Sequence, residues 1–288
     1  MSTIVVTGTS SGIGLATAIS LGRAGHAVYA TMRNLDRAAA LREAVAKENL
    51  PVSILAMDVD SDESVAKAAA AVRSQAGFVE ALVNNAGIEQ RGSVEELPLA
   101  RFRAVMETNY FGALRCIQAF LPEMRERRKG CIVNVSSVAG RISSSPLGPY
   151  AATKFALEAI SEALAQEVKP FNIRVAIVEP GIIDTPMARR VEAAPVDSRY
   201  PQSLRFSRMF EASLANPVPP SLVGDKIREV IESGNGQLRY PVGPDAEGFL
   251  SWRSSMSDEE WVNWGALDDE AWYDRLQEDV GLSARRGR

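Results

Sequence analysis

A phenol and an ammonium group stand four residues apart in the stretch YAATK, which runs from Tyr150 to Lys154. The preceding SSSPLGP is typical of a turn, so we expect a helix to begin near Pro149. Side chains at helix positions i and i+4 lie one above the other, which would bring the two groups to the same point. Such a pair can exchange a proton with a substrate, although alone it could be a coincidence of the surface.

Few other residues offer acid–base or metal chemistry. The only histidine, His26, lies in GRAGHAVYA between an expected helix and an expected strand, and we interpret it as a surface turn residue. The two cysteines, Cys116 and Cys131, lack metal-ligand spacing and a partner histidine, so we interpret them as small buried apolar residues. A Ser-His-acid triad, a metal site and a redox role are therefore not expected.

Length and composition indicate a globular protein. The 288 residues are 46% hydrophobic, enough for a full core, and fit one large domain. The net charge is −4, and residues 244–288 carry 11 acidic and 5 basic side chains. No basic surface typical of nucleic-acid binding is indicated.

The start of the chain shows no targeting signal. It runs directly into the apolar stretch TIVVTG without a charged n-region or a cleavage site. No segment approaches the roughly 20 apolar residues that would span a bilayer. We therefore expect a soluble, cytoplasmic protein without a membrane span.

Short apolar runs alternate with longer helical patterns along the chain. The expected strands are TIVVT, AVYATM, VSILAM, ALVNN, CIVNVS, RVAIVE and QLRYPV. The expected helices include LATAISLGRAG, SVAKAAAAVRSQ, ARFRAVMETNYFGALRCIQAFLPEMRERR and AATKFALEAISEALAQEV. Strands that are apolar throughout indicate burial on both faces. The alternation predicts an α/β fold with a doubly wound parallel sheet in three α/β/α layers.

The first expected turn, TGTSSGIG, places Gly8, Gly12 and Gly14 between a strand and a helix. Glycines there let the backbone approach a pyrophosphate, whose charge the helix N-terminus favours. The spacing is G-x-x-x-G-x-G instead of the G-x-G-x-x-G dinucleotide fingerprint. The position after the first strand still indicates a dinucleotide site.

The end of the second expected strand, ATMRN, indicates which dinucleotide binds. An NAD site offers a carboxylate for the ribose 2′-hydroxyl, whereas an arginine accommodates a 2′-phosphate. Met32 occupies the place of the carboxylate and Arg33 follows it, so NADP(H) is favoured. Arg33 could also be an ordinary solvated charge. Asp36 could be the carboxylate of an NAD site, although its position is typical of the first turn of a helix.

With these motifs the chain resembles the short-chain dehydrogenase/reductase family from about Thr3 to Gly243. The turn TGTSSGIG, the pair Asp58-Val59, the NNAG of residues 84–87, Asn109, the spaced set Ser137, Tyr150 and Lys154, and PGIIDT of residues 180–185 follow the family's order. VYATMRN and YAATKFALEAISEAL further resemble the branch of 17β-hydroxysteroid and retinol-type dehydrogenases. The resemblance implies a Rossmann-type domain over 1–243.

The resemblance also implies roles. Tyr150 would be the acid in carbonyl reduction and the base in alcohol oxidation, and Lys154 would favour the phenolate and bind the nicotinamide ribose. Ser137 would donate to the substrate oxygen, and Asn109 would hold a water that connects Lys154 to solvent. With the glycine turn and Arg33, the expected cofactor contacts are Gly8, Thr9, Ser10, Ser11, Gly12, Ile13, Gly14, Arg33, Asp58, Val59, Asn85, Ala86, Gly87, Tyr150, Lys154, Pro180, Gly181, Ile183 and Thr185.

The pattern changes after Thr185. The segment at about 186–219 is too long and proline-rich for an ordinary connection, and we expect a mobile lid over an elongated apolar substrate. The stretch between Ser137 and Tyr150 would supply the facing wall. The lid's apolar members are Met187, Val191, Leu204, Phe206, Met209, Phe210 and Leu214. They could instead pack on a partner subunit or on the acidic extension 244–288, which contains all four tryptophans.

Oligomerisation is also expected. Phe155, Leu157, Ile160 and Leu164 form an apolar face on the helix after Tyr150, and helices at this place pair in family dimers. Simple packing on the sheet is the alternative. The predicted protein is an NADP(H)-dependent oxidoreductase that interconverts a secondary alcohol and a ketone or aldehyde, as a homodimer or homotetramer. Its rivals are an NAD-linked catabolic alcohol dehydrogenase and a non-catalytic NADP-sensing module.

Overall fold

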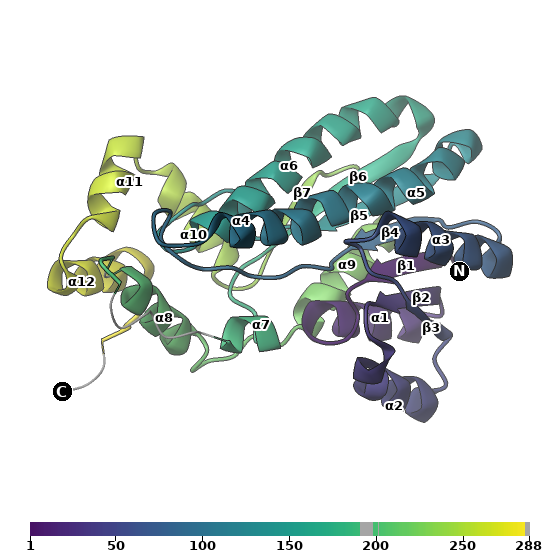
Figure 1. The fold of residues 1–288 in the computed structure, drawn as a ribbon, viewed down its shortest axis with the longest axis horizontal. Coiled ribbons are helices and arrows are strands. Elements are labelled where there is room, and N and C mark those ends of the chain that lie inside the picture. Colours follow the sequence, from purple (N-terminus) through teal and green to yellow (C-terminus); the bar gives the residue numbers. More distant parts are fainter. Residues whose placement is uncertain (191–197, 201, 286–288) are drawn as a thin grey trace.

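A parallel sheet forms the centre of the molecule in the computed structural model, which describes residues 1–190, 198–200 and 202–285 (Figure 1). The sheet has seven strands in the order β3-β2-β1-β4-β5-β6-β7, and every neighbouring pair is parallel. The strands are β1 (Thr3–Thr7), β2 (Ala27–Met32), β3 (Val52–Ala56), β4 (Ala81–Asn84), β5 (Gly130–Val135), β6 (Ile173–Pro180) and β7 (Arg239–Val242). The predicted strands and the doubly wound sheet are confirmed.

Helices cover both faces of the sheet, which explains why the central strands are apolar throughout. One face carries α1 (Gly12–Arg23), α2 (Ala39–Glu48) and α9 (Ser221–Ser233), which pack with β1, β2 and the later strands in one core cluster. The other face carries α3 (Asp62–Ala76), α5 (Gly112–Arg127) and α6 (Gly148–Val168) around a second cluster. The result is the predicted three-layer α/β/α arrangement.

A π-helical turn interrupts the long helix that the sequence predicts around residues 100–128. Helix α4 (Leu99–Met106) leads into η2 (Glu107–Phe111), whose backbone follows π geometry, and α5 continues at Gly112. Single π turns inside helices often occur at functional sites. Here the turn carries the buried Thr108 and Asn109 toward α6.

The prediction that His26 is a surface turn residue is wrong. Its ring is buried, its Nδ1 accepts a hydrogen bond from the Ser2 backbone N–H at 3.2 Å, and its Nε2 lies 3.1 Å from Glu232 of α9. Helix α9 crosses this turn from a distant part of the chain, which local sequence does not reveal. Cys116 and Cys131 are free and buried as predicted, and burial raises the pKa of Cys116 to about 12.

Four helices beyond the sheet form a unit that we name the cap: α8 (Gln202–Ser213), α10 (Ala246–Ser254), α11 (Asp258–Gly265) and α12 (Asp269–Val280) (Figure 1). Its centre is an aromatic cluster that includes all four tryptophans. Trp261 and Trp264 stack in parallel with ring centroids 5.4 Å apart, and Trp252 meets Trp264 edge-on at 4.9 Å. The acidic extension is therefore folded around its own small core.

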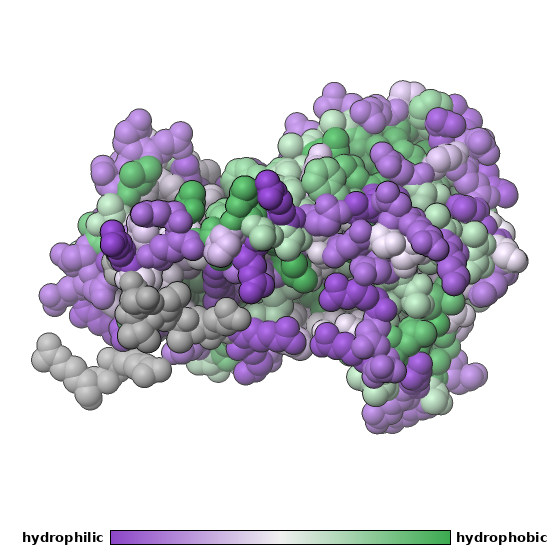
Figure 2. Space-filling model, in the orientation of Figure 1, coloured by the Kyte–Doolittle hydropathy of each residue, from purple (hydrophilic) through white to green (hydrophobic). Residues whose placement is uncertain are grey.

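The apolar face predicted for α6 is divided between core and surface. Leu157 and Leu164 are buried, Ile160 is half-buried, and only Phe155 is 43% exposed. Figure 2 shows apolar surface over α5 and α6 among largely hydrophilic residues. Packing on the sheet therefore accounts for most of this face. Among the described helices, none is both long and apolar enough to cross a bilayer.

Candidate active site

The loops at the carboxyl ends of the strands enclose one large cavity of about 1580 Å³. Open α/β sheets bind ligands at this edge, beside the point where the strand order reverses. Here that point lies between β1 and β4. The glycine turn, the NNAG loop, the start of α6, the PGIIDT loop and the cap all contribute to the walls. The cavity is large enough for a dinucleotide with a second molecule beside it.

The glycine turn forms a cradle that side chains would fill. Gly8 and Gly12 have φ angles of +70° and +57°, which disfavour other residues. A Cβ on Gly14 would lie 2.3 Å from the Gly8 carbonyl oxygen and 2.4 Å from Nδ2 of Asn85. Helix α1 begins directly at this turn, so its free N–H groups face the cradle. These residues fit the pyrophosphate of a nicotinamide dinucleotide.

The NNAG loop is fixed by hydrogen bonds to β1. Thr7 Oγ1 accepts from the backbone N–H groups of Asn85 and Ala86, at 3.0 and 2.9 Å. The Asn85 side chain donates to the carbonyl oxygens of Thr7 and Gly8, at 2.9 and 3.1 Å. Asn85 therefore holds the two loops together and places Ala86 and Gly87 on the cavity wall.

Most of the predicted cofactor contacts line this cavity, and two lie behind its wall. The cavity is lined by Gly8, Ser10, Ser11, Gly12, Ile13, Arg33, Asp58, Val59, Asn85, Ala86, Gly87, Tyr150, Lys154, Pro180, Gly181, Ile183 and Thr185. Thr9 is fully buried, and its hydroxyl and its N–H both donate to the Thr31 carbonyl. Gly14 is enclosed by Gly8 and Asn85. Thr9 and Gly14 thus shape the site from behind.

The end of β2 forms the rim where an adenosine ribose would lie. Met32 is buried, whereas the Arg33 side chain is 70% exposed and its Nη1 lies 4.0 Å from Asp60. Arg37, four residues further on, also lines the cavity, and sequence reasoning missed it. Asp36 belongs to the short helix η1 (Leu35–Ala38), where its N–H donates to Asn34 Oδ1 at 2.8 Å.

Tyr150 and Lys154 project from the first turns of α6, which begins with Pro149 in its N-terminal turn as predicted. The Lys154 Nζ atom lies 5.6 Å from the centre of the Tyr150 ring and donates to the Val135 carbonyl at 2.8 Å. The Ser137 hydroxyl donates to the Pro180 carbonyl at 3.4 Å and acts on the phenol to lower its pKa. Ser137 also accepts from the Ala139 N–H at 3.1 Å, which orients it at the start of η3 (Val138–Gly140).

Burial shifts the protonation of both groups toward their neutral forms. It raises the pKa of Tyr150, the negative charge of Glu89 raises it further, and the Ser137 hydrogen bond opposes the shift. Burial lowers the pKa of Lys154 to about 8, against the opposing effect of Glu158. The predicted lowering of the phenol pKa is therefore absent from the protein alone.

Asn109 supports α6 from the π turn. Its Nδ2 donates to the Ile88 carbonyl at 2.9 Å and to Thr153 Oγ1 at 3.0 Å, and its Oδ1 accepts from the Ile88 N–H at 2.8 Å. Asn109 is buried and does not line the cavity. Because its side chain is fully engaged, it links the NNAG loop to the helix of Tyr150. That Asn109 holds a water connecting Lys154 to solvent stays a prediction.

A residue from the far end of the chain holds the loop after β6. Asp245 Oδ2 accepts from the Ile182 N–H at 2.8 Å, and burial raises the pKa of its carboxyl group. Its Oδ1 would lie 2.1 Å from a Cβ on Gly181, so only glycine fits there. Sequence reasoning missed Asp245, because no local signal connects the residue after β7 with the loop after β6.

The substrate end of the cavity is largely apolar. Phe206, Met209 and Phe210 of α8 pack against Ala139, Leu147, Ala151 and Tyr150. These three residues therefore face the wall between Ser137 and Tyr150, as predicted for the segment to which they belong. Among its other apolar members, Leu204 is exposed, Met187 lies at the margin of exposure, and Val191 falls outside the described residues.

The alternative prediction for the lid, packing on the tryptophan-rich extension, also holds in part. Met209 contacts both Tyr150's cluster and the aromatic cluster of the cap. Arg205 donates to the Leu267 carbonyl at 2.7 Å and to Asp269 at 2.5 Å, which binds α8 to the loop before α12. Arg91, which sequence reasoning also missed, lies over the rings of Phe206 and Phe210 at 5.0 and 4.6 Å.

Comparison with known proteins agrees with this geometry. The family model "short chain dehydrogenase" matches residues 2–195. A 3-ketodihydrosphingosine reductase of Bacteroides thetaiotaomicron is 36% identical over 246 residues, 84% of this chain and 87% of that protein. Retinol dehydrogenase 8 of Bos taurus is 41% identical over 215 residues, which cover 72% of this chain and 68% of that protein. A short-chain dehydrogenase structure from Streptomyces avermitilis is 34% identical with a TM-score of 0.78, covering 92% and 96% of the two chains.

The matches cover most of the chain and are not confined to the short motifs. The structural likeness includes almost the whole chain, and the similarity to a retinol dehydrogenase agrees with the finer resemblance of the sequence. The residues that form the dinucleotide cradle and the Tyr150 site lie within the matched range. The chain therefore belongs to the short-chain dehydrogenase family, whose members use a nicotinamide cofactor to interconvert alcohols and carbonyl compounds.

Proposed function

We propose that the protein is an NADP(H)-dependent oxidoreductase that interconverts a secondary alcohol and a ketone or aldehyde on a bulky, apolar molecule. The observation that carries this proposal is the position of Tyr150. Ser137 acts on its hydroxyl, Lys154 Nζ lies 5.6 Å from its ring centre, and the ring belongs to one apolar cluster with Phe206 and Phe210. A proton donor thus stands where the dinucleotide cradle meets an apolar chamber.

The bound cofactor would supply or accept the hydride. In carbonyl reduction, the Tyr150 hydroxyl gives its proton to the oxygen that gains negative charge, and the Ser137 hydroxyl donates a hydrogen bond to that oxygen. The raised pKa of Tyr150 keeps the proton available in the protein alone. Lys154 as an ammonium ion stabilises the resulting phenolate. In alcohol oxidation the same phenolate accepts the proton.

Two guanidinium groups at the rim support the choice of NADP(H). Arg33 and Arg37 line the cavity at the end of β2, and Met32 occupies the place of the carboxylate that an NAD site offers. Arg33 has only a loose contact with Asp60, so it is free to pair with a 2′-phosphate. An NAD-linked dehydrogenase is the alternative, and it would be expected to carry an acid at this position.

The apolar chamber and the relatives support a bulky substrate. The packed members of α8 are aromatic or thioether side chains, and aromatic residues of the cap, including Phe249 and Trp252, continue the wall. A 3-ketodihydrosphingosine reductase and a retinol dehydrogenase are among the similar proteins, and both names refer to long hydrocarbon compounds. A small polar ketone would leave most of this wall without a partner.

We also propose that the protein forms a dimer through α5 and α6. The exposed Phe155 of α6 and the exposed Phe111, which ends η2 directly before α5, supply its apolar surface. This area is small, since Leu157 and Leu164 are committed to the core. Size-exclusion chromatography with light scattering, on the wild type and on a Phe111→Ser, Phe155→Ser variant, tests the proposal.

Turnover with a matched pair of tyrosine variants tests the main proposal. Oxidation of NADPH is followed by its absorbance, with NADH, a steroid-sized ketone and a small sugar ketone as comparisons. Tyr150→Phe should lower turnover about 100-fold or more and leave NADPH affinity nearly intact, because only the proton-donating hydroxyl is removed. The control is Tyr240→Phe on β7, which removes a buried hydroxyl that has no hydrogen-bond partner in the described part of the chain.

The outcomes separate the rival functions. Tight NADPH binding without turnover on any carbonyl compound would support the non-catalytic sensing module. A Tyr150→Phe enzyme that keeps more than about a tenth of the wild-type rate would contradict the assigned proton donor. Preference for the sugar ketone would contradict the bulky apolar substrate.

A further inference from the structure

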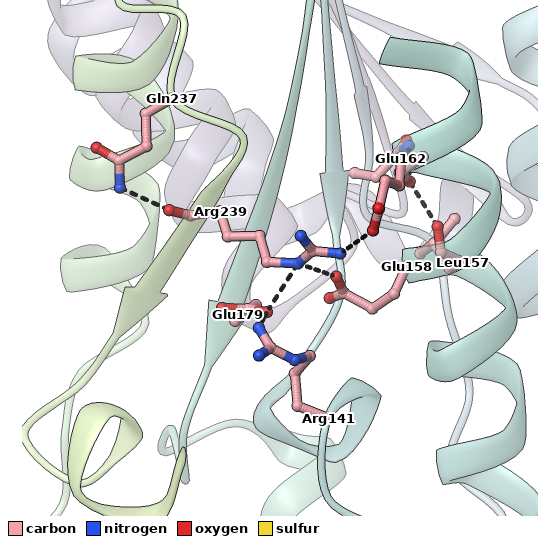
Figure 3. Close-up of polar contacts among 9 residues, drawn as sticks. Arg141, Leu157, Glu158, Glu162, Glu179, Gln237 and Arg239 are labelled. Atoms are coloured by element: carbon pink, nitrogen blue, oxygen red, sulfur yellow. Dashed lines mark hydrogen bonds and ion pairs between the residues drawn. The ribbon is translucent and has the colours of Figure 1, made fainter. Parts of the chain in front are cut away.

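A group of charged residues, two of them buried, joins β7 and β6 to the helix α6 that carries Tyr150 and Lys154 (Figure 3). Arg239 of β7 reaches toward α6, where its Nε donates to Glu158 Oε2 at 3.0 Å and its Nη2 donates to Glu162 Oε2 at 2.8 Å. Its Nε also lies 3.8 Å from Glu179 of β6, whose Oε1 accepts from Arg141 at 3.3 Å. The group thus connects α6, β6, β7 and the loop after η3.

Its two inner carboxylates are in an environment that usually excludes charge. The side chains of Glu179 and Glu158 are only 1% and 5% exposed, whereas that of Glu162 is 54% exposed. Burial raises the pKa of Glu179, and the nearby Glu158 raises it further. Burying carboxylates is costly unless they are paired, so sites that keep them often use the charge.

Glu158 stands one helical turn after Lys154 on the same side of α6. Burial alone pushes the Lys154 amine toward its neutral form, and the negative charge of Glu158 opposes that effect. Lys154 donates to the uncharged Val135 carbonyl, which offers no ionic compensation. Glu158 is therefore the anion that acts on this buried amine.

The Glu158 side chain is held in place from several sides. Arg239 fixes one oxygen, while Glu158 Oε1 is buried and has no hydrogen-bond partner among the described residues. A Cβ on Gly140 would lie 2.9 Å from Glu158 Cγ and 2.6 Å from Ser136 Oγ, so the glycine leaves room for the carboxylate. The position of the charge is thus specified by β7 and η3 together.

The other charged groups around α6 contact or act on different atoms. Glu89, in the loop after β4, acts on Tyr150. The π turn presents the uncharged Asn109, and Arg101 and Arg103 of α4 and Lys169 of η4 (Lys169–Phe171) are exposed. Glu179 and Arg141 offset one another beneath Glu158, and Glu162 is directed at the outer nitrogen of Arg239.

We propose that Glu158 is a positioning residue for the reaction: clamped by Arg239, its carboxylate keeps the buried Lys154 side chain in its ammonium form. The inference rests on the proposed function, since it assigns to Lys154 the stabilisation of the Tyr150 phenolate. Without Glu158, Lys154 would lose its proton at a lower pH and would stabilise the phenolate less.

The matched variants Glu158→Gln and Glu162→Gln test this proposal. Both remove a carboxylate that accepts from Arg239, and both keep the shape of the side chain. NMR of ¹³C-labelled lysine measures the pKa of Lys154 directly, with the signal assigned from a Lys154→Arg variant. Glu158→Gln should lower that pKa by roughly one unit, the size typical of a nearby opposite charge, and Glu162→Gln should leave it nearly unchanged.

A pH profile and the conservative variant Glu158→Asp distinguish a specific effect on Lys154 from a general loss of structure. The alkaline limb of the pH profile for ketone reduction should move to lower pH in Glu158→Gln, and Glu158→Asp should restore part of the shift. An unchanged Lys154 pKa in Glu158→Gln, or an equal shift in both Gln variants, would overturn the proposal. Because NMR detects Lys154 without turnover, an inactive wild type would contradict the proposed function and leave this test intact.

Discussion

The two ends of the active-site cavity are built from different kinds of interaction. At the cofactor end, backbone groups and glycines define the shape: Gly8 and Gly12 have positive φ angles, and Asn85 and Thr7 connect the loops through main-chain atoms. At the substrate end, side chains of the cap define it, through packed aromatic rings and the bonds of Arg205.

This difference indicates how each end can change. A backbone-defined cradle admits few substitutions, since almost any added atom meets main chain. A wall of aromatic and thioether side chains can be reshaped one residue at a time, because such groups repack. One polar contact that joins the cap to the core is the Trp261 indole N–H donating to the Ser143 carbonyl at 2.8 Å. The same scaffold can therefore keep one cofactor and vary its substrate.

The largest predicted contrast comes from glycine-to-alanine changes in two helices, one at each end. In Gly14→Ala the new Cβ would meet the Gly8 carbonyl and Asn85, so we expect loss of NADPH binding and about 1–3 kcal/mol lower unfolding free energy. Gly248→Ala in α10 has no atom within 4 Å and should stabilise by up to about 1 kcal/mol through helix propensity. Calorimetry and NADPH titration measure both. Equal effects would remove the distinction between the two ends.

The next effect concerns the rim of the cofactor end. Arg33→Ala should weaken NADPH binding by about 1.5 kcal/mol, roughly tenfold, because a charged hydrogen bond to the 2′-phosphate is lost. NADH affinity should change little, as it lacks that phosphate. Arg42→Ala in α2, exposed and outside the cavity lining, is the control for a general charge effect. Wild-type binding of NADH at least as tight as that of NADPH would refute the assignment.

The pH dependence of turnover should report the protonation of the buried catalytic groups. The pKa of Lys154 is lowered to about 8, so the ammonium form is present below that pH and lost above it. The kcat/KM for NADPH in ketone reduction should therefore fall above about pH 8, by up to about tenfold per unit, since this parameter reports groups of the free enzyme. Alcohol oxidation, which needs the phenolate, should instead rise with pH. A reduction profile that stays flat to pH 10 would contradict the role of Lys154.

The smallest effect is expected at the substrate wall. Phe206→Ala removes a ring that packs beside Tyr150, so kcat/KM for a steroid-sized ketone should fall by about fivefold, roughly 1 kcal/mol. The value for a small ketone and the NADPH affinity should be nearly unchanged. Phe171→Ala, at a ring of η4 outside the cavity lining, is the comparison. Equal losses on both ketones would show that the wall supports folding more than selectivity.

Sequence reasoning predicted the cofactor end far better than the substrate end. The strands were recognisable because both of their faces are buried, and the glycine turn because its backbone tolerates no side chain. Tyr150 and Lys154 were recognised by their helical spacing and Ser137 by the family resemblance, and the three line the same cavity. These signals are local, so a single sequence carries them.

The features that were missed depend on contacts between distant segments. Asp245 reaches the loop at Ile182, and Arg239 reaches Glu158, through the adjacency of β6 and β7 with α6. His26 was misjudged for the same reason, because α9 buries it. The π turn around Asn109 packs against α6, and the helix propensities of its residues do not predict it. The closeness of α8 to the aromatic cluster of the cap likewise follows from tertiary structure alone.

The gathering of all four tryptophans in the cap gives the protein a built-in optical reporter. No tryptophan lies in the sheet or in the helices that cover it, so tryptophan emission comes from the cap alone. Trp252 and Trp264 also line the cavity that the dinucleotide cradle opens into. Reduced nicotinamide absorbs in the band where indole emits, so binding of NADPH should quench this light by energy transfer. Fluorescence can therefore follow movement of the cap during each binding step, without any attached dye.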